Sequence, residues 1–158
     1  MPTPAFPIAS TTLWAGSPSG RSGFAASADA SDTDFLALLA AYRPTGGIAR
    51  EGEIATRSVG GGPLQLARQI TERSVLSFEW HDENWLPVFQ FEPATPTVKP
   101  AIQILVNELS GALDGWELAR WFVQPNTWLD EVAPLPVLHS QFSRVHDVAR
   151  ALRYTRCA

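Results

Sequence analysis

The segment from residue 114 to residue 138 constrains the fold most, because helix formers and helix breakers alternate in it at short intervals. Asp114 can cap a short helix, and Pro125-Asn126 ends that helix. The apolar pair Trp128-Leu129 follows, and a second short helix is expected to begin near Pro134, because proline is tolerated in the first turn. The large apolar side chains of the first helix are Trp116, Leu118, Trp121 and Phe122. This order predicts a small helical bundle and contains no catalytic motif.

Two longer helices are expected to complete this bundle, which we place over residues 93–158. From about Val98 to Ala112, apolar residues recur with the 3.6-residue period of one helix face: Val98, Ile102, Leu105, Val106 and Leu109. The last helix, from about Gln141 to Tyr154, has the apolar set Phe142, Val145, Val148, Ala149 and Leu152. Residues 92–100 contain three prolines and are expected to be a short rigid connector before the bundle.

The half of the chain before this connector predicts helices followed by a β-hairpin. Ser31 or Asp32 can cap a first helix that ends at Pro44, a second helix fits residues 48–57, and Pro63 opens a third. After Ser74 the apolar period changes, which predicts strands at residues 75–80 and 85–91 joined by a turn at residues 81–84. Pro87 restricts the second strand to an edge or to a position that forms no ladder hydrogen bond.

Three helices followed by a hairpin have the outline of a winged helix-turn-helix. The predicted fold class is therefore mainly α with a small β-hairpin, in which residues 34–92 form a winged-helix-like unit and residues 93–158 form the small helical bundle. Residues 1–33 are rich in Pro, Ser, Ala, Gly and Thr and are expected to form a flexible leader. Its large apolar residues, which are Phe6, Leu13, Trp14 and Phe24, could dock on the body or on another subunit. A start codon assigned too far upstream is a further alternative.

Composition and charge narrow the class of function. The chain has 158 residues, of which 45% are hydrophobic, and this suits one domain or two very small ones. A net charge of -4 gives no general attraction to nucleic acid or to a membrane surface. No apolar run approaches the roughly 18 residues that cross a bilayer, and the single cysteine, Cys157, excludes an internal disulfide framework. We therefore expect a soluble cytoplasmic protein.

Patterns typical of enzymes are missing from the sequence. His81-Asp82-Glu83 forms a compact polar turn, and His139 and His146 stand seven residues apart, but no His-x-x-x-His pair occurs. Gly60-Gly61-Gly62 lacks the Lys-Ser/Thr of a phosphate loop, and there is no Gly-x-Ser-x-Gly elbow. We expect no catalytic function, no cofactor and no metal.

The order of motifs from Leu86 to Leu152 resembles the toxin-binding domain of the MbcA/ParS/Xre antitoxin family. The family pattern is an alanine-tryptophan-leucine helix, a Pro-Asn turn, a hydrophobic pair and a Pro-x-x-x-Leu helix before a final amphipathic helix. Residues 87–91, Pro-Val-Phe-Gln-Phe, are similar to the segment that precedes this domain in several members. The resemblance implies that the chain binds and neutralises a partner toxin, typically a RES-domain toxin that consumes NAD. It also implies that, if the protein binds DNA, it regulates the transcription of its own operon.

The resemblance further implies that the C-terminal end obstructs the toxin, and the candidate residues are Arg150, Arg153, Tyr154 and Arg156. Residues 74–140 carry a charge of -7, whereas residues 141–158 carry +3, from four Arg against Asp147. Arginine can clamp an oxyanion in a two-pronged manner, so this end would suit an acidic or phosphate-binding toxin pocket. The alternative is that these side chains only solvate the last helix and complement its dipole.

The tryptophans and the apolar helix faces predict further contacts. We expect Trp116 or Trp121 to be internal, and Trp80, Trp85 and Trp128 to be surface anchors, with Trp128 a candidate toxin contact. A homodimer is expected through the helix that carries residues 98–109 or through the N-terminal helices.

The winged-helix outline supports an alternative function, that of a DNA-binding transcriptional regulator without a toxin partner. The second helix of a helix-turn-helix enters the major groove, and the candidate side chains here are Gln65, Arg68, Gln69, Thr71 and Arg73. The charge pattern opposes this function, because the arginines alternate with Glu51, Glu53 and Glu72 and the hairpin turn is acidic. A helical scaffold that binds no DNA therefore stays open beside it.

Overall fold

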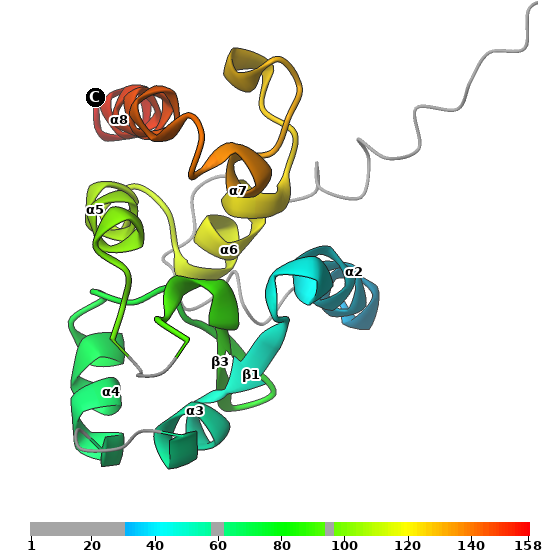
Figure 1. The fold of residues 1–158 in the computed structure, drawn as a ribbon, viewed down its shortest axis with the longest axis vertical. Coiled ribbons are helices and arrows are strands. Elements are labelled where there is room, and N and C mark those ends of the chain that lie inside the picture. The colour runs from blue at the N-terminus through cyan, green and yellow to red at the C-terminus, as the bar shows by residue number, and fades with distance from the viewer. Residues whose placement is uncertain (1–30, 58–61, 94–96) are drawn as a thin grey trace, which may run out of the picture.

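The computed structural model describes residues 31–57, 62–93 and 97–158, which form helices packed around a small antiparallel sheet (Figure 1). The helices are α2 (Asp32–Tyr42), α3 (Glu51–Arg57), α4 (Gly62–Thr71), α5 (Pro100–Leu109), α6 (Gly115–Val123), α7 (Pro134–Val137) and α8 (Phe142–Cys157). The strands are β1 (Ile48–Arg50), β2 (Phe78–Trp80) and β3 (Glu83–Pro87), and 3₁₀ turns lie at Arg43–Thr45, Val88–Gln90 and Thr127–Leu129. The predicted mainly α fold with a small β part is confirmed. No helix in the described ranges has the length and apolar character needed to cross a membrane. The predicted leader, apart from its last residues, lies outside the described residues.

Local capping signals set the starts of two helices as predicted. The Ser31 hydroxyl accepts from the Asp34 N–H, and the Asp34 carboxylate accepts from the Ser31 N–H, which forms a capping box at α2. Asp114 and Glu117 form the same reciprocal pair at α6, with distances of 2.8 and 3.0 Å. Each box satisfies backbone donors that a helix start would otherwise leave without partners.

The predicted second helix is wrong at its start, because Ile48–Arg50 forms β1 and the helix begins only at Glu51. β1 pairs antiparallel with β3, with Ala49 opposite Leu86, so that the expected hairpin becomes a three-stranded sheet in the order β1-β3-β2. Gly46 and Gly47 turn the chain into this strand with φ values of 105° and 82°, which favour glycine. The pairing partner is remote in sequence, so the local pattern could not indicate it.

The hairpin itself is shorter and tighter than predicted. Trp80 pairs with Glu83, so only His81 and Asp82 form the loop, and both have positive φ (49° and 60°). Positive φ at both loop residues matches the right-handed twist of the strands. β3 lies in the centre of the sheet, so the edge position for Pro87 is wrong, and Pro87 occupies the last residue of the strand.

The side chain of Gln90 supplies hydrogen bonds beside Pro87, which has no N–H to donate. The carboxamide oxygen accepts from the Leu76 N–H at 2.8 Å, and the carboxamide nitrogen donates to the C=O groups of Leu76 and Pro87 at 2.8 and 2.9 Å. Gln90 is fully buried. Its amide thus satisfies three backbone groups that are cut off from water.

The buried side chains form one cluster that runs through both predicted units, so the boundary near residue 93 does not separate two cores. α6 lies at the centre and packs against α2, β2 and α7. The Tyr42 hydroxyl donates to the Ala119 C=O at 2.5 Å, and burial raises the pKa of this phenol well above its ordinary value. A Cβ on Gly115 would collide with the Ser77 C=O, so glycine permits the close approach of α6 to the chain before β2.

Candidate partner-binding site

The loop between α6 and α7 exposes a tryptophan from a hydrogen-bonded backbone. The Asn126 side-chain oxygen accepts from the Trp128 N–H at 2.9 Å, and the Asn126 N–H donates to the Val132 C=O at 3.2 Å. The Asn126 C=O accepts from the N–H groups of Leu129 and Glu131 at 2.9 and 3.0 Å. Leu129 is buried, whereas Trp128 is 57% exposed and Val132 is 39% exposed. The loop therefore holds one apolar side chain in the core and presents two others to solvent.

The same loop contains two residues in the left-handed region and is joined to α8 by an ion pair. Asp130 and Glu131 have φ values of 58° and 62°, and a non-glycine residue in the left-handed region persists only where its surroundings hold it there. The Arg144 Nη1 lies 2.8 Å from the Asp130 Oδ2, which joins the loop to the first turn of α8. The Arg144 hydrogen bond holds the pKa of the Asp130 carboxyl below its ordinary value. We call residues 125–133 the Trp128 loop.

A tryptophan presented on a fixed loop is suited to binding another protein. Aromatic side chains supply large contact areas with few rotatable bonds, and they are enriched at the centres of protein interfaces. Since the loop is already ordered, a partner that covers Trp128 and Val132 would lose little conformational entropy in ordering them. The exposed carboxylates of Asp130 and Glu131 border these apolar side chains.

The C-terminal candidates lie on α8, which runs through to Cys157. The Arg153 Nη1 lies 2.9 Å from the Glu108 Oε1 on α5, and the Arg156 Nη1 lies 3.3 Å from the Glu117 Oε1 on α6. These two arginines are thus paired with the acidic part of the same chain. The acidic segment and the basic end are both visible in the sequence, but the sequence does not show that they pair with each other.

Arg150 and Tyr154 differ from these paired arginines. Both are exposed, Tyr154 at 69%, and they stand four residues apart on one helix face. Arg150 makes no ion pair within the described ranges. These two side chains are therefore available to a partner without the breaking of an ion pair.

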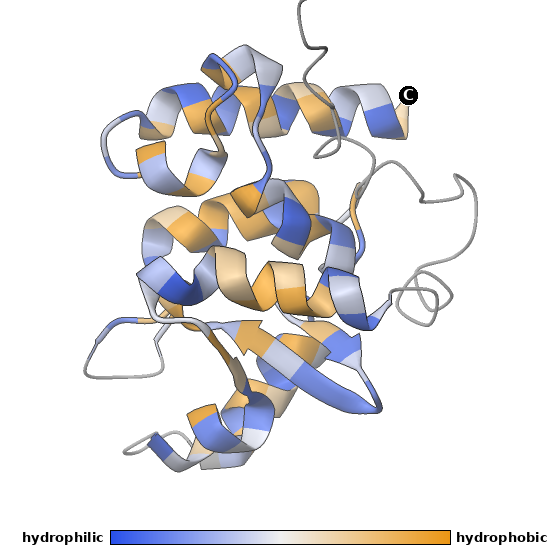
Figure 2. Cartoon of the chain, turned by 90° about the vertical axis from the view of Figure 1, so that its right-hand side faces the viewer, coloured by the Kyte–Doolittle hydropathy of each residue, from blue (hydrophilic) through white to orange (hydrophobic). Residues whose placement is uncertain are grey.

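The predicted toxin contacts do not gather into one patch. The Trp128 loop meets α8 at Arg144, whereas Tyr154 lies near the other end of the helix, about 15 Å further along its axis at 1.5 Å per residue. A partner that contacts both Trp128 and Tyr154 must therefore lie along α8, which Figure 2 shows crossing the top of the molecule.

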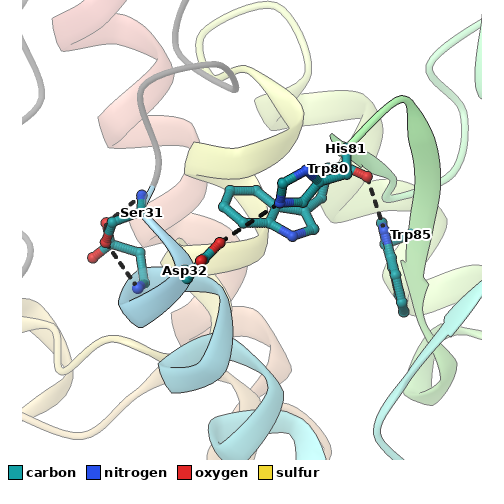
Figure 3. A network of polar contacts seen from close by, with 6 residues as sticks. Ser31, Asp32, Trp80, His81 and Trp85 are labelled. Carbon is teal, nitrogen blue, oxygen red and sulfur yellow. Dashed lines mark hydrogen bonds and ion pairs between the residues drawn. The ribbon is translucent and has the colours of Figure 1, made fainter.

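The remaining tryptophans divide between confirmed and wrong predictions. Trp116 and Trp121 are both buried, with 4% and 8% exposed, so the prediction that one or the other is internal is confirmed. Trp80 is wrong as a surface anchor, because it is 9% exposed and stacks on Phe35 at 5.0 Å. Trp85 is half-buried, and its indole N–H donates to the Trp80 C=O at 3.2 Å (Figure 3). The tight hairpin folds these rings toward α2, which the alternation of the strands alone could not show.

The DNA-binding candidates on and after α4 are partly engaged within the fold. The Arg68 Nε donates to the Glu72 Oε1 at 2.8 Å, and the Arg73 Nη2 donates to the Leu113 C=O at 2.7 Å. Gln65 is exposed and Gln69 is half-buried. The Thr71 hydroxyl donates to the Ala67 C=O within α4. The charge of Arg68 is thus offset by the Glu72 carboxylate, whereas Arg73 donates to a neutral C=O and keeps its charge.

The histidines take separate positions. The His81 Nε2 lies 3.6 Å from the Asp32 Oδ1 beside the hairpin (Figure 3), and the His146 Nε2 lies 3.9 Å from the Glu108 Oε2 between α8 and α5. His139 is exposed. Across residues 31–57, 62–93 and 97–158, no three His, Cys, Asp or Glu side chains are placed to hold a metal ion.

The apolar face predicted for residues 98–109 belongs to the core of the protomer. Ile102, Leu105, Val106 and Leu109 are all buried, and α5 packs against α8. This face therefore cannot also serve as the surface of a homodimer.

Comparison with protein-family models, with curated protein sequences and with solved structures found no match to this chain.

Proposed function

We propose that this protein is antitoxin-like and that it binds and neutralises a partner toxin, with no catalytic activity or cofactor of its own. A RES-type toxin that consumes NAD is the partner that the order of motifs implies. The observation that carries the proposal is the exposure of Trp128 at 57% on a loop held by the hydrogen bonds of Asn126. A large exposed aromatic side chain on a preorganised loop supports a binding role.

The binding surface follows from the positions of the exposed side chains. Trp128 enters an apolar pocket of the toxin, Val132 packs beside it, and the carboxylate of Glu131, which forms no ion pair in the described part of the chain, faces a basic group at the rim of that pocket. Charged groups at a rim chiefly affect the rate of association and the choice of partner. Arg150 and Tyr154 extend the contact along α8.

Arg153 and Arg156 are weaker candidates than the sequence indicated. To contact a toxin, each must first leave its carboxylate partner, Glu108 or Glu117. Arg150 needs no such exchange, so its substitution by Ala should weaken inhibition of the toxin more than Arg153→Ala does.

The test is co-expression with the product of the adjacent gene, followed by affinity measurement and an assay of NAD consumption. Trp128→Ala should weaken binding at least tenfold, since interface tryptophans typically contribute about 2 kcal/mol or more. Its melting temperature should stay near that of the wild type, because the side chain is exposed. Leu64→Ala is the matched control, since Leu64 is 85% exposed on α4, away from the Trp128 loop. Full inhibition of the toxin by Trp128→Ala would contradict the proposal.

Deletion of residues 153–158 separates the contribution of the C-terminal end from that of the loop. If the end obstructs the toxin active site, the truncated protein should still bind through Trp128 but should leave NAD consumption partly restored. Full inhibition by the truncated form would remove these residues from the mechanism and leave the body of the domain as the inhibitory element.

A DNA-binding regulator of the winged-helix type is the second candidate. The observation that favours it is the order helix, strand, helix, helix, strand, strand over residues 32–87, with β3 between β1 and β2. α4 would then be the helix that enters the major groove, with Gln65 and Arg68 toward the bases. Purified protein should retard a fragment of its own promoter with steep salt dependence, and Arg68→Ala should reduce that dependence. If the protein does not retard the fragment even at low salt, then it is not a DNA-binding regulator and does not autoregulate its operon through DNA binding.

A further inference from the structure

Helix α2 is apolar on its outer side as well as on its inner side. Leu38 and Tyr42 are buried in the core, whereas Leu36 is 62% exposed and Ala40 is exposed. Between residues 35 and 41 the helix contains no polar side chain. A surface helix normally turns polar residues toward solvent, and a helix that is apolar all round is normally covered on both sides. Figure 2 looks onto this side of the molecule and shows α2 largely in hydrophobic colours.

The exposed side chains of α2 form one stripe with a definite shape. Thr33, Leu36, Ala40 and Arg43 follow one another at spacings of three and four residues, which places them on one face. Leu36 projects from the middle of the stripe, and Ala40 stands one turn away as the smallest apolar side chain. A projecting residue next to a small one is the pattern by which two helices interlock at close distance.

The ends of the stripe carry opposite charges. Asp32 is exposed in the first turn, where its Oδ1 lies 3.6 Å from the His81 Nε2, and Arg43 is exposed immediately after the last turn. Arg43 forms no ion pair with any residue that the structure describes. Because the charges differ in sign at the two ends, the stripe is complementary to a copy of itself that runs in the opposite direction.

We propose that α2 is the interface of a homodimer in which the α2 helices of two copies pair antiparallel, about a two-fold axis that crosses the exposed stripe midway between Leu36 and Ala40. Leu36 of each copy then packs on Ala40 of the other, and Arg43 of each copy faces Asp32 of the other. The helix dipoles are opposed, which is the favourable arrangement. A two-fold axis requires one surface to be complementary to itself, and this stripe meets that requirement. The inference depends on the fold alone and holds or fails separately from the toxin-binding proposal.

The dimer is expected to be weak, because one short helix from each copy lies at the low end of specific interface sizes. A dissociation constant on the order of 10 to 100 µM is expected, so sedimentation equilibrium should span about 1 to 500 µM protein. The protein should change from a 17.2 kDa species to one of twice that mass across this range.

Leu36→Lys places two ammonium groups at the centre of the paired stripe and should weaken association at least tenfold. The matched control is Leu64→Lys, which introduces the same charge at a leucine that is 85% exposed on α4. This control should dimerise as the wild type does. Circular dichroism should show unchanged helix content in both variants, since both leucines are exposed.

A charge exchange tests the antiparallel arrangement itself. Asp32→Arg and Arg43→Asp should each weaken association, because each places like charges opposite each other in the pair. The double variant restores opposite charges and should recover most of the lost affinity. Each single change also places an unfavourable charge at one end of its own helix dipole. If the single variants associated less only because α2 is destabilised in this way, the two losses would add in the double variant, and affinity would not recover.

Three results would overturn the proposal. The first is a full-length protein that remains at 17.2 kDa up to the highest concentration. The second is a dimer that Leu36→Lys and Leu64→Lys affect equally. The third is a Leu36→Lys variant that loses thermal stability without any change in association, which would assign the stripe to contacts within one chain.

Discussion

Replacement of Gln90 by leucine tests whether the buried side-chain amide of Gln90 stabilises the fold through its three hydrogen bonds to backbone groups. The substitution nearly conserves side-chain size but removes one acceptor and both donor hydrogens from a fully buried position. Three hydrogen bonds of 2.8 to 2.9 Å are lost, and the Leu76 N–H, the Leu76 C=O and the Pro87 C=O lose this partner. A buried backbone group without a partner costs about 1 to 3 kcal/mol, and the added apolar surface of leucine offsets part of this. The free energy of unfolding should fall by about 3 to 5 kcal/mol.

The measurement is urea denaturation followed by the fluorescence of the six tryptophans. Gln103→Leu is the matched control, because the half-buried Gln103 makes a single hydrogen bond, from its Nε2 to the Ser74 C=O at 2.7 Å. This control should lose about 1 kcal/mol. A loss for Gln90→Leu no larger than the loss for Gln103→Leu would refute the argument that this side chain satisfies three backbone groups.

Gln90→Glu adds a pH dependence whose sign is fixed by the geometry. A carboxylate can accept from the Leu76 N–H but cannot donate to either C=O, whereas the protonated acid can donate to one. Burial raises the pKa of the introduced carboxyl above its unfolded value of about 4.3. The protonated form of this carboxyl therefore stabilises the fold below about pH 4, and this stability is lost as the pH rises through the folded pKa. The difference in unfolding free energy between variant and wild type should shrink on acidification, and a difference that grows would contradict the hydrogen bonding described for this position.

Three further outcomes are expected. Trp121→Ala should lower the unfolding free energy by about 3 to 5 kcal/mol in the same urea assay, because Trp121 is 8% exposed, and an unchanged melting temperature would show that the ring does not fill the core. Gly115→Ala should lower the melting temperature, because the added Cβ would collide with the Ser77 C=O. Gly111→Ala is the control and should not lower it, because Gly111 has open space around it, and equal effects of the two substitutions would show that α6 does not approach Ser77 closely. The pKa of the Asp130 carboxyl, followed by NMR, should lie below its ordinary value of 3.8, so the ion pair with Arg144 is formed above that pH and is lost as the pH falls through the lowered pKa. Arg144→Gln should return this pKa to its ordinary value.

Local signals account for what could be predicted about the helices. A capping residue, the acid three positions later and a proline or glycine after the last turn act within a few residues, so Ser31, Asp114 and Pro125 could be interpreted correctly from the sequence. The 3.6-residue period of Ile102, Leu105, Val106 and Leu109 likewise identified a buried face, although it could not show whether α8 of the same chain or another copy covers that face.

The candidate site could be predicted only in part, for a related reason. Trp128 is exposed, as the sequence led us to expect, and the adjacent Leu129 is buried, but the sequence alone does not show which side chain of this pair enters the core. Whether Arg150 or Arg153 is available to a partner depends on Glu108, which lies on a different helix and is brought to Arg153 by the packing of α5 on α8.

The sequence by itself determined the capped starts of α2 and α6 and the apolar faces of α5 and α8, because capping and periodicity depend on neighbouring residues. Only the tertiary structure decided that residues 48–50 form a strand, that Trp80 is buried against Phe35, and that Gln90 bonds to Leu76. Each of these depends on residues that meet only when distant segments pack together, and the free energy of such a contact is present in no local stretch of the chain.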